Sequence, residues 1–165
     1  MTQLHHSPTG WVSYLCTGGA LAVVGTIITA LAYTVVPMTS DSLLGSRKAA
    51  EIVEQFTSIR TLAGLAFVPL ALLIMAGGSL WLLLRQWATQ WRFGVAVAVL
   101  VASGFTVIAY VAPYVTLNSD FNQADTGVSP ISLSGPGLWL ALIGALITAA
   151  GAVLELRAAK NNTSS

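Results

Sequence analysis

Charged residues are scarce in this sequence. Only 8% of its 165 residues are Asp, Glu, Lys or Arg, and the formal net charge is +1. Four long apolar stretches contain none of these residues and no His: 11–36, 61–84, 93–112 and 137–154. Membrane enzymes and ion-coupled transporters use ionisable side chains inside the bundle to carry protons, bind ions or ligate metals. We therefore expect a protein that is not an enzyme, with no catalytic, cofactor or metal site in these stretches.

Cysteine is nearly absent too. The single residue, Cys16, allows neither an intrachain disulfide nor a CxxC redox pair. This excludes thiol oxidoreductases with paired cysteines and claudin-type proteins with a cysteine pair in a loop. The first stretch lacks the glutamate of small multidrug exporters, and the two histidines, His5 and His6, precede it, which argues against a haem-bearing anchor. A net charge near zero gives no basic surface for nucleic acid.

Hydrophobic residues make up 55% of the chain. A helix rises about 1.5 Å per residue, so about 20 apolar residues cross the hydrocarbon core of a bilayer. The four stretches are apolar all round and lack the alternation of a barrel strand. The leader has no Lys or Arg and the first run exceeds a signal-peptide core, so we keep it as a retained helix. The sequence predicts an all-α, single-domain integral membrane protein over residues 1–165, a four-helix transmembrane bundle in contact with the lipid bilayer.

Basic residues indicate an orientation. Four of them flank the ends of the stretches on one predicted side, which also holds both termini: Arg85, Arg92, Arg157 and Lys160. Three lie on the other side: Arg47, Lys48 and Arg60. The positive-inside rule then predicts that both termini are cytoplasmic. The layout resembles that of small bacterial proteins with four transmembrane helices, so a bacterial plasma membrane is the expected location.

The first outer loop contains a helix signal. Ser46 is a suitable N-cap for a helix through Ile59, in which Ile52, Phe56 and Ile59 recur at helical spacing. We expect a short amphipathic helix that lies on the membrane surface or caps the bundle. In the alternative reading Ile52 and Phe56 contact a partner helix.

The second outer loop, residues 115–134, is rich in turn-forming residues and has two acids, Asp120 and Asp125. Their spacing does not match an EF-hand, which needs a distal Glu, so a solvated loop is expected rather than a metal site. The two acids are also candidate contacts for a partner.

Small residues recur with the same 4-3-4-3 spacing in the first and fourth stretches. The first set is Gly18, Ala22, Gly25, Thr29 and Ala32, and the second is Gly137, Ala141, Gly144, Thr148 and Gly151. Helices in lipid associate by close backbone approach at such residues. We expect these two helices to pack together along both rows, and substitution of Gly25 or Gly144 by Leu to destabilise the bundle far more than Leu82→Ala.

Prolines and tyrosines complete the pattern. Pro69 is expected to kink the second helix. The first and third helices are expected to end before Pro37 and Pro113, a parallel that suggests either a duplicated hairpin or convergence on proline helix ends. Tyr33 and Tyr110 lie about a turn before these prolines and are expected to anchor the membrane interface.

These features favour a non-catalytic membrane subunit or accessory protein that packs against a larger membrane protein complex, or against copies of itself. The alternative is a small oligomeric channel or permease for a neutral solute. A third reading places an enzymatic or sensing site in the outer loops.

Overall fold

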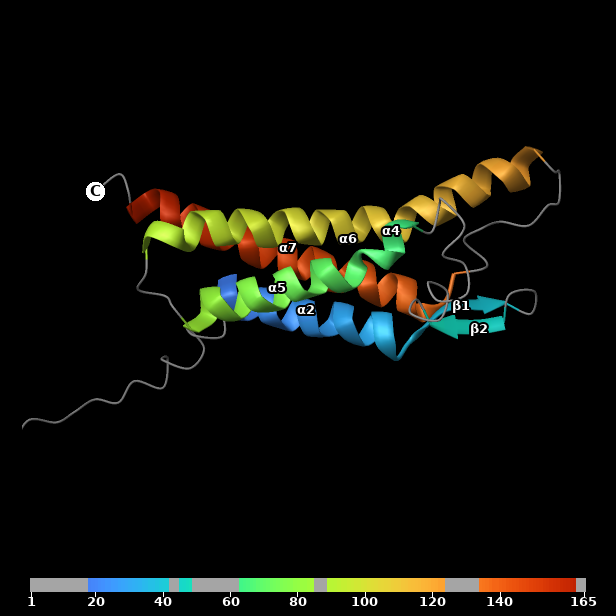
Figure 1. Ribbon diagram of the computed structural model, residues 1–165, viewed down its shortest axis with the longest axis horizontal. Helices are drawn as coiled ribbons and strands as arrows, with labels where there is room; N and C mark the ends of the chain where they lie inside the picture. The colour runs from blue at the N-terminus through green and yellow to red at the C-terminus, as the bar shows by residue number, and fades with distance from the viewer. Residues whose placement is uncertain (1–17, 42–44, 49–62, 85–88, 124–133, 163–165) are drawn as a thin grey trace, which may run out of the picture.

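The computed structural model describes residues 18–41, 45–48, 63–84, 89–123 and 134–162 (Figure 1). Four long helices form a bundle: α2 (Gly18–Thr34), α5 (Val68–Leu84), α6 (Thr89–Gln123) and α7 (Pro136–Asn162). A single helical turn, α4 (Ala63–Ala66), precedes α5. Strands β1 (Pro37–Asp41) and β2 (Gly45–Lys48) form an antiparallel pair.

Successive helices run in opposite directions, and each packs against two neighbours. α2 lies between α5 and α7, and α6 closes the ring between the same two helices. The most extensive contact joins α2 to α7, which are the first and last of the four helices along the chain. The strand pair lies at the end of the bundle where α2 ends and α7 begins (Figure 1).

Three helical segments are long and apolar enough to cross a membrane: Gly64–Leu84, Trp91–Pro113 and Pro136–Lys160. α2 is equally apolar but has 17 residues within the described chain, and residues 11–17 of the predicted first span lie outside it. Large apolar side chains cover the outside of the bundle, with Leu73 71% and Ile108 66% exposed. The chain is therefore a helical bundle with three helices that could span a bilayer.

The predicted start of a helix at Ser46 is wrong. Ser46 lies in β2, opposite Ser40 of β1. Thr39, Ser40 and Gly45 have low helix propensity. Pairing of the two strands satisfies the backbone hydrogen bonds of these segments without a helix. β1 is also held against the start of α7, where the Gly135 amide donates to the Met38 carbonyl at 2.6 Å. Residues 49–62, with Ile52, Phe56 and Ile59, lie outside the described residues.

The predicted end of the third helix at Pro113 is also wrong. α6 continues through Pro113 to Gln123, so residues 115–123 of the expected turn-rich loop are helical. Figure 1 shows this part of α6 reaching past the other helices and changing direction. A proline inside a helix removes one backbone hydrogen bond and bends the helix without having to end it. α2, by contrast, ends before Pro37. The two halves of the chain therefore differ at the prolines, where a duplicated hairpin predicts that they are alike.

Pro69 coincides with an interruption of the second helix. Helical geometry breaks at Phe67, between α4 and α5, and Pro69 is the second residue of α5. Proline has no amide hydrogen for the Leu65 carbonyl and its ring crowds that carbonyl, so a continuous helix is disfavoured there. The first turn of a helix tolerates proline, which explains why α5 starts where it does.

Candidate functional site

The small residues predicted to pack together lie along the contact between α2 and α7. A Cβ atom built on Gly25 would lie 2.5 Å from the Gly144 carbonyl oxygen and 2.5 Å from the Thr148 amide nitrogen. One built on Gly144 would lie 2.7 Å from the Gly25 carbonyl oxygen. Gly18 and Gly151 face each other in the same way. The two backbones thus approach so closely that no side chain larger than hydrogen fits at these positions.

The remaining residues of the two rows are buried at the same contact or at its end. Ala22, Thr29, Ala141 and Thr148 have no exposed surface. The Thr148 hydroxyl donates to its own helix at Gly144, 3.0 Å away, and reaches the Ala22 carbonyl at 3.4 Å. Gly137 lies farther along, where a Cβ would meet the Pro37 carbonyl at the start of β1.

Glu155 lies at the other end of this contact, and it is only 3% exposed. One carboxylate oxygen, Oε1, accepts a hydrogen bond from the backbone amide of Gly19 at 2.9 Å. Gly19 is the second residue of the described part of α2. Glu155 therefore links α7 to the backbone of α2.

The second oxygen of Glu155 is bound by Arg92 of α6. The Arg92 Nε donates to Oε2 at 2.7 Å, and one terminal nitrogen of the same guanidinium lies 2.5 Å from Oε2. The Arg92 side chain is 15% exposed, so the pair is largely removed from solvent. Three helices, α2, α6 and α7, thus converge on one carboxylate.

The sequence does not predict Glu155 as a site residue, because the apolar stretch ends at Leu154. Arg92 is predicted only as a basic residue that flanks a stretch. The signal that identifies Glu155 is the helical spacing itself: it follows Gly151 by four residues and is the next member of the row of small residues on α7. A carboxylate at that position faces α2, and because burial removes its hydration it needs hydrogen-bond donors from the neighbouring helices.

The network around Glu155 is a set of hydrogen bonds and an ion pair between helices. Both oxygens of Glu155 are engaged by donors of the fold, so the carboxylate acts as an acceptor that holds helices. Removing one partner of a buried ion pair is strongly destabilising, because the remaining charge is then buried without compensation. In the described ranges no three His, Cys, Asp or Glu side chains gather to form a metal site.

The other predicted residues fall outside this network. Asp120 lies in the extended part of α6, and Asp125 is outside the described residues. Tyr110 is fully buried, which contradicts the expectation that it anchors the membrane interface, and Tyr33 is 8% exposed within the same cluster. Both rings pack among helices because each lies on the inward face of its own helix.

None of the protein-family models, curated proteins or solved structures compared with this chain matches it. The class is therefore defined by the fold and by the network around Glu155: a bundle of apolar helices, three of which could span a membrane, held at one end by a buried ion pair.

Proposed function

We propose that the chain is a non-catalytic membrane subunit, a four-helix transmembrane bundle that packs against a larger membrane protein complex. The observation that carries this proposal is the use of the buried polar groups by the fold itself. Glu155 is occupied by Arg92 and Gly19, and the buried hydroxyls of Thr and Ser donate to carbonyls of their own helices. Groups held in this way support packing rather than chemistry.

The outer surface supports the same proposal. Apolar side chains on α5 and α6, including Leu70, Leu73, Val101 and Ile108, are more than half exposed. Such surfaces are favourable against lipid or against helices of another membrane protein. Apolar side chains such as Met75, Leu82 and Val99 occupy the interior, each at most 1% exposed. A pore for a neutral solute would accordingly need several copies of the chain.

The proposal includes an orientation and a location. Both termini are placed in the cytoplasm of a bacterial cell, and the strand pair is placed outside. Its support is the set of four basic residues that flank the apolar stretches on one predicted side. Two of the described ones, Arg92 and Lys160, lie in the first turn of α6 and the last turn of α7.

The test is purification of the tagged chain from its own membrane in a mild detergent, followed by native mass spectrometry. The expected result is a complex of fixed stoichiometry with a second polypeptide. Ile108→Ala and Leu73→Ala, both on the exposed surface, probe which face binds the second polypeptide. A variant that keeps its thermal stability but no longer binds the second polypeptide identifies the contact. A tagged membrane protein of similar size controls for detergent-dependent association.

A different result of the same experiment would favour the channel. If the chain is recovered only as copies of itself, and liposomes that contain it show faster flux of a neutral solute such as glycerol, the proposal is wrong and the channel reading replaces it.

A further inference from the structure

Tyr110 of α6 is the largest fully buried side chain in the described part of the molecule. It lies in a cluster to which all four long helices and β1 contribute, and other members of this cluster include Tyr33, Leu65 and Ala141. Within the described chain its hydroxyl has no hydrogen-bond partner. A buried polar group left in this state costs about 1–3 kcal/mol.

The other buried hydroxyls behave differently. Those of Thr26, Thr29 and Thr106 donate to the carbonyl four residues earlier, at 2.7 to 2.9 Å. Ser79 and Ser103 do the same three residues earlier. These side chains are short enough to reach their own backbone, whereas a tyrosine hydroxyl lies at the far end of a ring and depends on what surrounds it. The cluster around Tyr110 is apolar apart from the second tyrosine, Tyr33.

The same cluster has a second unusual polar group. Leu65 has no exposed surface and belongs to the cluster. Pro69 lies four residues later and has no amide hydrogen, so the Leu65 carbonyl lacks the donor it would have in a regular helix. In membrane helices, carbonyls freed by proline are satisfied by neighbouring helices, by Ser or Thr side chains, by local changes of helical geometry or by ordered water. Three alanines of the cluster, Ala32, Ala109 and Ala141, keep the surrounding side chains short.

We propose that the Tyr110 hydroxyl binds one small hydrogen-bonding guest buried in this cluster. The guest is either an ordered water molecule or the carbonyl or hydroxyl group of a lipid-soluble molecule. It accepts a hydrogen bond from Tyr110, and a water or hydroxyl guest could also donate to a carbonyl such as that of Leu65. This inference is independent of the proposed role as a subunit, since the cluster lies inside the bundle.

The first test is Tyr110→Phe, which keeps the ring and removes only the hydroxyl. If the hydroxyl binds a guest, the equilibrium constant for unfolding in detergent rises about fivefold, the equivalent of one ordinary hydrogen bond. An unpartnered hydroxyl gives the opposite result, a variant that is as stable as the parent or more stable, and this would overturn the proposal. Tyr33→Phe in the same cluster serves as the matched control for the loss of a tyrosine hydroxyl.

The second test identifies the guest. With tyrosine labelled at the hydroxyl-bearing carbon, nuclear magnetic resonance would show the Tyr110 hydroxyl proton in contact with a water resonance if the guest is water. Solvent extraction and mass spectrometry would yield a compound at one copy per chain, missing from Tyr110→Phe, if the guest is organic. A destabilised variant with neither signal would also overturn the proposal, because the partner would then be part of the chain.

Discussion

Glu155 brings together groups from three helices: its own α7, Arg92 of α6 and the Gly19 amide of α2. A charge at this depth is unfavourable by itself and becomes favourable only with both partners in place. Arg92 suits the role because its planar guanidinium offers several donors and remains charged at any relevant pH. The two residues are 63 positions apart in the sequence, so their contact reports on the assembled bundle.

We predict that Glu155→Gln lowers the free energy of unfolding by about 3 kcal/mol, since it removes the negative charge that Arg92 binds. The amide oxygen of Gln can still accept from Gly19, so the effect isolates the charge. Equilibrium unfolding in mixed micelles measures it. Arg157→Gln, an exposed position on the same helix, is the control and should change stability by less than about 0.5 kcal/mol.

A double variant separates the charge pair from the packing around it. Arg92→Met and Glu155→Leu should each destabilise strongly, while the combination should recover much of the loss, because replacing both charges with apolar groups is often close to neutral. The expected coupling is about 2 kcal/mol, within the range for residues in contact. Additive effects of the two substitutions would show that the pair does not form.

α2 and α7 are joined by the close approach of their backbones at Gly25 and Gly144. We predict that Gly25→Leu and Gly144→Leu each lower stability by at least about 1–3 kcal/mol, the usual cost of overpacking. Gly77→Leu and Gly104→Leu are matched controls, because a Cβ built on either glycine meets nothing within 4 Å. Thermal unfolding in detergent compares the unfolding temperatures of the four variants. Equal unfolding temperatures for all four would show that α2 and α7 do not pack at Gly25 and Gly144.

Leu82→Ala does not serve as a mild control. Leu82 is 1% exposed and packs in a cluster with Ala96, Val99 and Ala152. Truncating a buried leucine leaves a cavity and typically costs about 2–5 kcal/mol. The sequence does not indicate whether Leu82 faces the interior or the lipid, because the helix is apolar on all sides.

Sequence reasoning located the apolar helices well and their boundaries less well. Helices α5, α6 and α7 each contain most of a predicted stretch, because long runs without charge have few other stable conformations in lipid. The errors lie where local preference competes with tertiary contacts. Ser46 has the chemistry of an N-cap, yet β2 pairs with β1; Pro113 has the chemistry of a helix end, yet α6 continues.

The network around Glu155 could be predicted only in part. The spacing of the row on α7 extends from Gly151 to Glu155, so the inward direction of the carboxylate was readable. Its pairing with Arg92 and Gly19 was not, because each contact joins residues at least 63 positions apart and depends on how the helices are arranged around the bundle.

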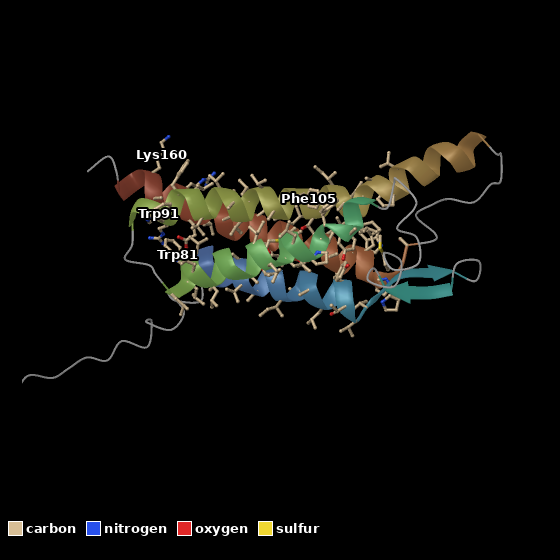
Figure 2. The ribbon with its side chains drawn as sticks, viewed as in Figure 1. Trp81, Trp91, Phe105 and Lys160 are labelled. Atoms are coloured by element: carbon tan, nitrogen blue, oxygen red, sulfur yellow. The ribbon has the colours of Figure 1, made fainter. Side chains whose placement is uncertain are left out.

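The whole molecule has two chemically different ends. Trp81, Trp91 and Lys160 gather at one end, while Phe105 lies along the apolar middle (Figure 2). Trp91 is 72% exposed, as expected for a ring at the level of lipid headgroups. At the other end lie the strand pair and Trp139, whose indole nitrogen donates to the Ser134 hydroxyl at 3.3 Å. An apolar band between two aromatic ends is the arrangement expected of a bundle that could span a membrane.

The most direct test of this account is whether the two ends lie on opposite sides of a membrane. Single cysteines at Ser46, in β2, and at Thr89, the first residue of α6, would be placed in a Cys16→Ala background and exposed to an impermeant thiol reagent in intact cells. We expect labelling of the cysteine at 46 and none at 89 until the membrane is permeabilised. Labelling of 89 alone would reverse the orientation; labelling of both in intact cells would contradict a bundle that crosses the bilayer.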